Sequence, residues 1–210
     1  MQVQVGYIEE VIMEVQIKKL NSELIEDYID FFDNRAFTDN REWSACYCVF
    51  FHWNDELDKS LRAPGVDIHE HNRNLASDFI RKGILQGYLA YVDGVVVGWC
   101  NANDKSGYES LESDKQPELW DEDNKDSKIK SVTCYVIAPE MRRKGIATKL
   151  LERVCSDALT DGYDYVEAYP AKIEKNIHMN YHGPFPLYEK CGFDLHKELE
   201  KKYIVRKTLK

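Results

Sequence analysis

Hydrophobic and polar positions alternate near the start of the chain and then change to a helical period. Residues 12–20 (IMEVQIKKL) alternate well enough for a half-buried strand. Asn21 and Ser22 favour a helix N-cap, and apolar side chains then recur every three or four positions over residues 22–34 (SELIEDYIDFFDN). A second helix is predicted over about residues 72–81. The chain therefore begins with a strand followed by two helices.

The middle of the chain predicts a hairpin and a buried strand. Residues 86–100 (QGYLAYVDGVVVGWC) contain two β-rich runs joined by Asp93 and Gly94, the pair that a two-residue type I′ turn requires. Residues 130–139 (KSVTCYVIAP) are apolar on both faces, as in a central strand, and Pro139 ends the run. The pattern therefore indicates a sheet with at least one fully covered strand.

The last third of the chain continues the mixed order. An apolar stripe at helical spacing begins at Ala147 and is closed by Gly162, and residues 163–171 (YDYVEAYPA) predict another strand. A short helix is expected around residues 184–191. The segments after it suit an antiparallel pair of strands, residues 193–200 and 201–209. The fold class is therefore α/β, in the α+β sense of a mixed sheet with helices.

One segment lacks this periodicity. Residues 104–128 (DKSGYESLESDKQPELWDEDNKDSK) are polar and acidic, and they predict a long exposed loop or insertion at about residues 104–129. A run of charges is usually a solvated surface. The alternative is a flexible rim that attracts a cationic ligand.

Composition limits the class of protein. A chain of 210 residues is long enough for one well-buried core, so we expect a single domain over residues 1–210. No apolar run reaches membrane-spanning length and no signal peptide is evident, and the six cysteines are scattered, so a reduced, cytoplasmic protein is expected. The formal net charge of −9 disfavours nucleic acid and favours a cationic small molecule.

A local cationic patch stands out against this acidic background. Arg142, Arg143 and Lys144 directly precede Gly145 and a predicted helix. The unpaired N–H groups at a helix start favour an anion, and residues without bulk let the backbone approach phosphate oxygens closely. Thr148 adds a hydroxyl donor. The alternative is a tight strand-to-helix turn with solvated basic residues.

The spacing of this loop resembles the GNAT family, the acyl-coenzyme A dependent N-acetyltransferases. The family's pyrophosphate loop, Arg/Gln-x-x-Gly-x-Gly/Ala, matches Arg142, Gly145 and Ala147. The resemblance continues through YVEAYP as the following strand and LYEKCGF as the helix that carries the family's tyrosine, and it covers about residues 86–193. It implies a mixed, mainly antiparallel twisted sheet flanked by helices, in which two central parallel strands, residues 131–137 and 164–169, splay apart.

The resemblance also implies a cosubstrate and a reaction. Acetyl-coenzyme A (acetyl-CoA) would lie between the splayed strands and transfer its acetyl group to a primary amine by direct attack in a ternary complex, and no metal is expected. Backbone N–H groups near Val136 and Ile137 would polarise the thioester carbonyl. The residues expected to bind the cosubstrate are Val136, Ile137, Arg142, Arg143, Lys144, Gly145, Ile146, Ala147 and Thr148.

Two side chains are candidates for proton transfer. By its place in LYEKCGF, Tyr188 resembles the family's general acid for the departing thiolate, and the alternative is that it packs the helix on the sheet. Glu167, on a predicted strand beside the splay, is a candidate base, although alternation could equally make it a structural partner. Asp104 and the acidic insertion are further candidates for the base.

Cysteine and histidine residues suggest other chemistry. The segment WSACYCVFFHW places Cys46, Cys48 and His52 within seven positions, which could form a metal or redox site, an apolar core or the wall of an acceptor pocket. Cys134 is expected to be an inert core thiol. Of the other histidines, His69 and His71 are expected on the surface, and His178 and His182 lie where an acceptor would enter.

The sequence leaves the acceptor open. The function it favours is acetyl transfer to a small-molecule amine, with a cationic acceptor expected from the charge. The alternatives are a catalytically silent coenzyme A-binding sensor or scaffold, and a metal or redox protein centred on Cys46 and Cys48. Many members of the family dimerise, so a homodimer is a further possibility, for which the sequence shows no interface.

Overall fold

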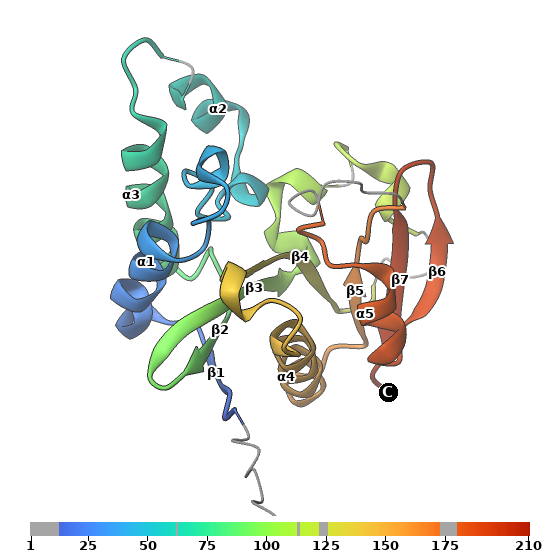
Figure 1. Cartoon of the computed structure of the whole chain (residues 1–210). Helices are drawn as coiled ribbons and strands as arrows, with labels where there is room; N and C mark the ends of the chain where they lie inside the picture. The colour runs from blue at the N-terminus through green and yellow to red at the C-terminus, as the bar shows by residue number, and fades with distance from the viewer. Residues whose placement is uncertain (1–12, 62, 113, 122–125, 173–179) are drawn as a thin grey trace, which may run out of the picture.

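A computed structural model describes residues 13–61, 63–112, 114–121, 126–172 and 180–210 of the chain. One sheet of seven strands has the order β1-β2-β3-β4-β5-β7-β6, in which the single parallel pair is β4 with β5 (Figure 1). The strands are β1 Gln16–Lys19, β2 Gly87–Val92, β3 Val95–Asp104, β4 Ile129–Ile137, β5 Tyr165–Ala168, β6 Asp194–Glu198 and β7 Tyr203–Thr208. The predicted mixed and mainly antiparallel sheet is confirmed.

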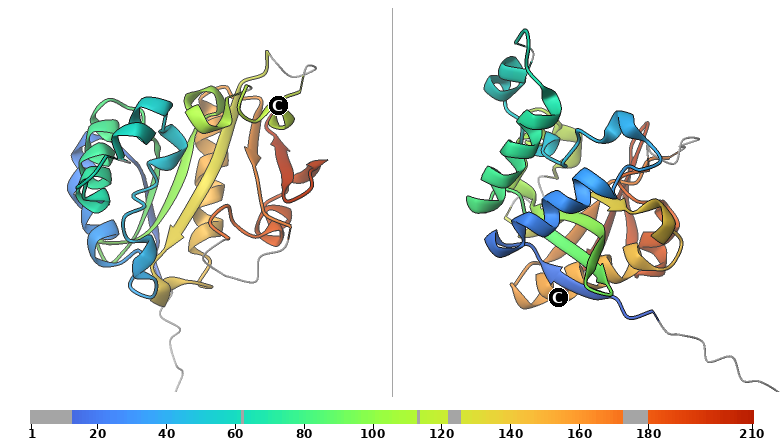
Figure 2. Two further views of the ribbon diagram at one scale, coloured as in Figure 1. Left: turned by 90° about the horizontal axis from the view of Figure 1, so that it is seen from above. Right: turned by 60° about the vertical axis from the view of Figure 1, so that its left-hand side comes forward.

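Helices cover both faces of the sheet (Figure 2). They are α1 Ile25–Asn34, α2 Asp55–Leu61, α3 Ile68–Arg81, α4 Ile146–Thr160 and α5 Phe185–Lys190. Helices α1 and α3 bury their apolar sides against one face, and α4 and α5 against the other. The three longest helices, α1, α3 and α4, each present an apolar stripe to the sheet because their hydrophobic residues recur every three or four positions.

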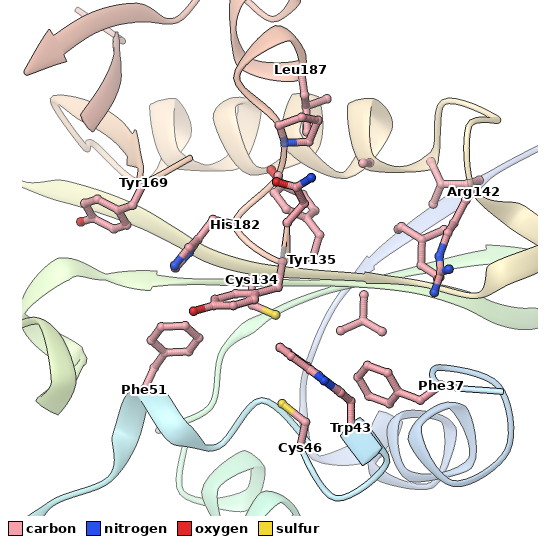
Figure 3. A pocket seen from close by; sticks show the side chains of 18 of the residues that line it. Phe37, Trp43, Cys46, Phe51, Cys134, Tyr135, Arg142, Tyr169, His182 and Leu187 are labelled. Carbon is pink, nitrogen blue, oxygen red and sulfur yellow. The ribbon is translucent and has the colours of Figure 1, made fainter. Parts of the chain in front are cut away.

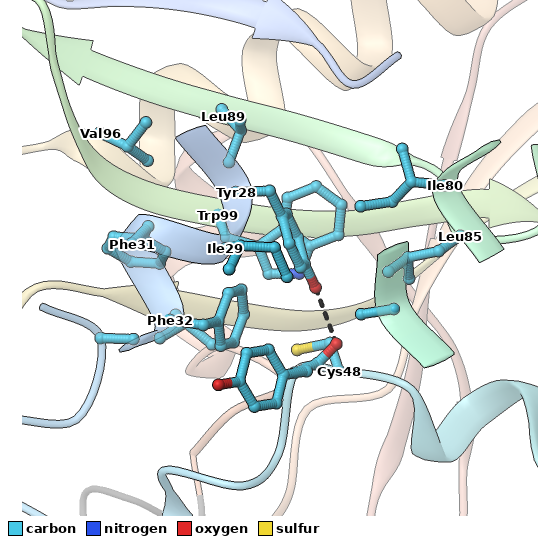
Figure 4. Close-up of a cluster of buried hydrophobic side chains, with 14 of the residues drawn as sticks. Tyr28, Ile29, Phe31, Phe32, Cys48, Ile80, Leu85, Leu89, Val96 and Trp99 are labelled. Carbon is cyan, nitrogen blue, oxygen red and sulfur yellow. Dashed lines mark hydrogen bonds between the residues drawn. The ribbon is translucent and has the colours of Figure 1, made fainter. Parts of the chain in front are cut away.

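The core under α1 is rich in aromatic side chains (Figure 4). Tyr28 and Trp99 are fully buried and meet edge to face, with ring centroids 4.9 Å apart. The Tyr28 hydroxyl donates a 2.7 Å hydrogen bond to the backbone carbonyl of Tyr47, which satisfies the polar end of a buried ring. Helix α1 is thereby tied to the segment that follows it as well as to the sheet.

Several predicted boundaries shift in the structure. β1 is shorter than residues 12–20, and its predicted first residue lies outside the described residues. Helix α3 begins four residues before the predicted start, because the Asp67 side chain caps it by accepting from the N–H groups of His69 and Glu70. The hairpin is confirmed, with positive φ at Asp93 (51°) and Gly94 (76°), as its turn requires. Helix α2 was not predicted.

The acidic insertion is folded rather than a loose loop. Over its described residues it forms short 3-10 turns, η4 Lys105–Gly107, η5 Glu109–Leu111 and η6 Pro117–Leu119. Tyr108, Leu111 and Leu119 are buried and form a small core with Tyr169 and Ile204 beside the end of β5. The prediction of an exposed loop was wrong here, because η5 and η6 each bury a leucine and η4 buries Lys105.

The central strand β4 carries the irregularity that opens the sheet. Its register with β3 shifts by one residue, so that Thr133 lies opposite no residue of β3. Because of this extra residue, Val132 and Tyr135 face the same side of the sheet although they are three positions apart. β5 pairs with β4 only as far as Val132, so residues 133–137 of β4 continue without β5 beside them. The two parallel strands therefore splay apart, as expected.

In the part of the chain that the structure describes, no helix has the length and apolar character needed to cross a membrane.

Candidate active site

A cavity of about 1350 Å³ opens at the splay of β4 and β5. In Figure 3, Arg142 lies at one end, Tyr169, His182 and Phe51 lie at the other, and Cys134 is between them. The walls come from the loop before α4, from β4, from the segment before α5, from the aromatic segment of residues 37–51, and from the insertion. The cavity is thus a meeting point of elements that are far apart in the sequence.

The first end of the cavity is the N-terminus of α4. Gly145, at φ 81°, is the N-cap residue, and the helix begins at Ile146 with no side-chain cap. Its first N–H groups therefore have no acceptor within the helix and face the cavity, where Ala147 and Thr148 also lie. A Cβ added at Gly145 would meet no atom within 4 Å, so there is open space beside this backbone. These features fit a diphosphate group.

The basic residues of the loop take different positions. Arg143 adopts a left-handed backbone at φ 62°, is exposed and lines the cavity. The Arg142 guanidinium is half-buried and engaged: it donates to both carboxylate oxygens of Asp39, at 2.5 and 3.2 Å, and to the Ile137 carbonyl at 3.2 Å. Lys144 is exposed and is not among the residues that line the cavity. In this structure Arg142 braces the loop, and Arg143 is the cation beside the helix terminus.

The β4 backbone offers its groups alternately to β3 and to the opening. Ala138 donates its N–H to the Val97 carbonyl of β3, so by strand alternation the N–H of Val136 also faces β3, where it pairs with Trp99. The expectation that Val136 donates to a thioester is corrected by this register. By the same alternation, the N–H of Ile137 points to the opening, and it remains the predicted donor to the thioester.

The backbone N–H of Tyr135 also points to the opening, where it donates a 2.6 Å hydrogen bond to the Tyr181 carbonyl. The segment before α5 therefore occupies part of the space that β5 leaves. The next residue, His182, is held there as well.

His182 is a histidine at the second end of the cavity (Figure 3). Its Nδ1 lies 2.6 Å from the Thr133 carbonyl, and because a carbonyl only accepts, Nδ1 carries the proton and Nε2 is an unprotonated acceptor. Burial lowers the pKa of His182 to about 4, against the hydrogen bond to Thr133, which raises it. His182 is therefore neutral at neutral pH. The bulge at Thr133 aims this carbonyl at the ring.

Tyr188 lies behind the cavity wall. Its side chain is fully buried, its hydroxyl donates to the His182 carbonyl, and burial holds its pKa well above the usual range. A Cβ on Gly183, which lines the cavity, would lie 3.1 Å from this hydroxyl. One glycine therefore separates the Tyr188 hydroxyl from the cavity. Action as the acid requires the hydroxyl to leave the His182 carbonyl.

Glu167 is held away from the cavity in a buried charge cluster. It accepts from Lys105 Nζ at 2.6 Å, from Arg206 Nε at 2.9 Å and from the Tyr169 hydroxyl at 2.9 Å, and its side chain is completely buried. A carboxylate with two cations and a hydroxyl around it is not free to take a proton from an acceptor amine. The structure therefore contradicts the assignment of Glu167 as base, and the physical reason is this cluster.

The other candidate bases lie away from the cavity too. Asp104 accepts from the Ser106 N–H and hydroxyl and caps the first turn of the insertion. Asp121 pairs with Arg206 at 3.3 Å, and Glu112 with Lys115 at 3.3 Å. Neither Asp104 nor any other acidic residue described in the insertion lines the cavity.

The cysteine segment forms a wall of the cavity and part of the core. Within it, η2 Arg41–Trp43 and η3 Phe50–His52 flank turns in which Tyr47 and Cys48 have positive φ. Cys46 and Cys134 line the cavity. Cys48 is buried, with its sulfur 3.2 Å from that of Cys134. A hydrogen bond from Cys48 lowers the pKa of Cys134, but burial together with the neighbouring Cys46 and Cys100 thiols outweighs this and leaves the pKa raised.

The remaining histidines have varied positions. His52 is buried between Tyr108 and Phe79, and burial lowers its pKa to about 4. His69 lies in α3, where its Nε2 is 3.2 Å from the Tyr47 hydroxyl. The expectation was a solvated histidine, but this side chain packs against Tyr47. His71 also lies in α3 and is half-buried, and its Nε2 is buried without a hydrogen-bond partner. His178 lies outside the described residues.

No described group of three or more His, Cys, Asp or Glu side chains could hold a metal ion.

Four further residues of the second end were not predicted: Ser110, Gln116, Tyr169 and Lys202. Gln116 and Ser110 come from the insertion, which the pattern had assigned to solvent. Lys202 precedes β7 in a run of charged residues, where nothing distinguishes it from its exposed neighbour Lys201. These four residues come together only where three segments meet at the end of β5: the insertion, the residues after β5 and the residues before β7.

Comparisons with known proteins agree with this fold. The model of the acetyltransferase (GNAT) family matches residues 17–193. An N-acetyltransferase from Staphylococcus aureus Mu50 is 12% identical with a TM-score of 0.53, over 94% of this chain and 99% of that one. The PaiA N-acetyltransferase from Thermoplasma acidophilum, solved in complex with coenzyme A, is 17% identical with a TM-score of 0.51, over 93% and 99%. No curated protein sequence matches the chain significantly.

The family model spans most of the chain, and the sheet order, the splay and the loop before α4 are all present. The chain therefore belongs to the GNAT family of acetyltransferases.

Proposed function

We propose that this protein transfers the acetyl group of acetyl-CoA to a primary amine of a small molecule, with both substrates bound in the one cavity. The observation that carries the proposal is the continuity of that cavity from the N-terminus of α4 to His182. A molecule held at the helix terminus by one end can extend beside β4 and meet an amine near His182 inside the cavity.

The residues present fit the cosubstrate. The backbone of Gly145 and the first turn of α4 would hold the diphosphate, with Arg143 beside it. The N–H of Ile137 would bond the arm that lies along β4. Acetyl-CoA supplies an acetyl thioester: a C–N bond forms as the C–S bond breaks, the amine loses a proton, and the thiolate is protonated.

His182 is the proposed acceptor of the amine proton. Its unprotonated Nε2 can hydrogen-bond the amine N–H and take the proton as the C–N bond forms. A base with a pKa near 4 is weak, and its advantage is that it is already neutral at physiological pH. A buried, partly cationic wall also favours the neutral form of the amine.

The test is the substitution His182→Asn, because an asparagine amide can still donate to the Thr133 carbonyl but has no counterpart of Nε2. We expect kcat to fall roughly 100-fold, with the affinity for acetyl-CoA unchanged in calorimetry. As the pH is lowered, the wild-type protein should lose activity only near pH 4, where His182 gains a proton. It should not lose activity near the usual histidine pKa of 6.5.

The matched control is His69→Asn, since His69 is a packed histidine outside the cavity. An unchanged kcat in His182→Asn, or a fall as large in the control, would contradict the role of His182.

A further inference from the structure

Lys202 places a positive charge in the second end of the cavity. It forms an isolated antiparallel bridge with Ala171, and Tyr203 beside it donates its N–H to the Pro170 carbonyl at 2.9 Å. The backbone of Lys202 is therefore fixed against the chain just after Tyr169, which lies at the end of the cavity opposite Arg142 (Figure 3). This lysine is remote from the helix terminus that would bind phosphate.

The ammonium group of Lys202 has a neutral partner. Its Nζ donates to Gln116 Oε1 at 2.7 Å, and no carboxylate among the described residues forms an ion pair with it. The side chain is half-buried, and burial lowers its pKa, while the charge of Glu118, which makes no ion pair with it, partly offsets this. Lys105, by contrast, is buried against Glu167. A half-buried cation that no carboxylate contacts directly is a site for an anion.

Two residues of the insertion complete this group. Gln116 donates from Nε2 to the Ser110 carbonyl at 2.6 Å, which fixes the amide so that Oε1 points to Lys202. The Ser110 hydroxyl is buried without a hydrogen-bond partner, although Ser110 lines the cavity. A lysine and an unused hydroxyl together offer two donors to one ligand group.

The charge of Lys202 affects the pKa of His182, the proposed base. Burial lowers the pKa of His182 and the charge of Lys202 lowers it further, and both residues line the cavity. Among the described residues of the cavity wall, Glu42 is the only acid, whereas Arg143, Lys190 and Lys202 are basic and a fourth basic residue, Arg142, is paired with Asp39. A second ammonium on the acceptor would therefore be repelled here, which argues against the cationic acceptor expected from the net charge.

We propose that the acceptor is an amine that also carries a carboxylate, as an amino acid does, and that Lys202 binds this carboxylate while the amine meets His182. The apolar side chains of Trp43, Phe50 and Phe51 on the cavity wall suit an acceptor with an apolar side chain. The inference rests on the proposed function and adds the chemical class of the acceptor.

The experiment compares amino acids with the amines left when their carboxylate is removed: L-phenylalanine with 2-phenylethylamine, L-leucine with 3-methylbutylamine, and L-methionine with 3-(methylthio)propylamine. The rate of coenzyme A thiol release is measured, and the acetylated product is confirmed by mass spectrometry. For at least one pair, the wild type should show a kcat/KM roughly tenfold or more in favour of the amino acid.

The variant Lys202→Met should abolish this preference and leave the affinity for acetyl-CoA unchanged. The control Lys201→Met removes the exposed neighbouring charge and should keep the preference. If no amino acid reacts faster than its partner amine in the wild type, or if Lys202→Met keeps the preference, the inference is overturned. Absence of acetyl-CoA binding would instead overturn the proposed function, so the two failures are distinct.

Discussion

At the scale of single residues, His182 and Tyr188 are linked through one backbone carbonyl. The Tyr188 hydroxyl donates to the carbonyl of His182, whose ring in turn donates to Thr133. Tyr188 therefore fixes the backbone that carries the proposed base. The family resemblance predicts a second role for Tyr188, as the acid that protonates the thiolate, and the two roles have different consequences for a double variant.

Tyr188→Phe should lower kcat at least about tenfold, because it removes either the acid or the hydrogen bond that holds His182 in place. The affinity for acetyl-CoA should not change. If Tyr188 acts by positioning His182, the double variant with His182→Asn should be no slower than the slower single variant. If Tyr188 is an independent acid, the two losses should multiply. A normal kcat in Tyr188→Phe would exclude both roles.

At the scale of elements, a buried charge cluster joins the insertion to the sheet. Lys105 of η4, Glu167 of β5 and Arg206 of β7 are almost fully buried, and both oxygens of the carboxylate are used. Burial lowers the pKa of Lys105, while Glu167 raises it. Removing one member of such a cluster leaves buried charge uncompensated, and that costs more than a surface ion pair.

Glu167→Gln should therefore lower the free energy of unfolding by about 3–5 kcal/mol, measured by urea denaturation. The turnover rate of the folded fraction should stay near that of the wild type. A triple variant, Lys105→Met with Glu167→Leu and Arg206→Met, replaces the whole cluster by apolar groups and should recover much of the stability. If turnover by the folded triple variant were slower by roughly 100-fold or more, Glu167 would be restored as a base.

The elements also show what the sequence could predict. The hairpin, the strand β4 and the helix α4 follow from local patterns: a pair of residues suited to positive φ, a β-branched apolar run, and an apolar stripe at helical spacing. The folded insertion did not follow, because short 3-10 turns have no period and their burial depends on Tyr169 and Ile204 from other segments.

The two ends of the site differ in the same way. The loop before α4 is continuous in sequence, so its spacing identified it. The second end joins Gln116, His182 and Lys202, which come from three segments, and its charges meet only after folding. Glu167 was misassigned because alternation places it beside the splay but does not show the two cations that surround it.

At the scale of the whole molecule, the central claim is that an acidic protein holds one anionic cosubstrate at one helix terminus. The formal net charge is −9, so general attraction cannot bring a phosphate to this surface. Binding must depend on the backbone at Gly145 and on the nearby cations. A negative charge placed at that glycine should therefore weaken binding without disturbing the fold.

The most direct measurement is a calorimetric titration of acetyl-CoA into the wild type, Gly145→Glu and Gly162→Glu. Gly145 and Gly162 lie beyond opposite ends of α4, have φ of 81° and 76°, and have open space for a Cβ, so the two variants carry similar backbone strain. The wild type and Gly162→Glu should bind alike, and Gly145→Glu should bind at least about tenfold more weakly. Equal binding by all three proteins, or none by the folded wild type, would contradict the account.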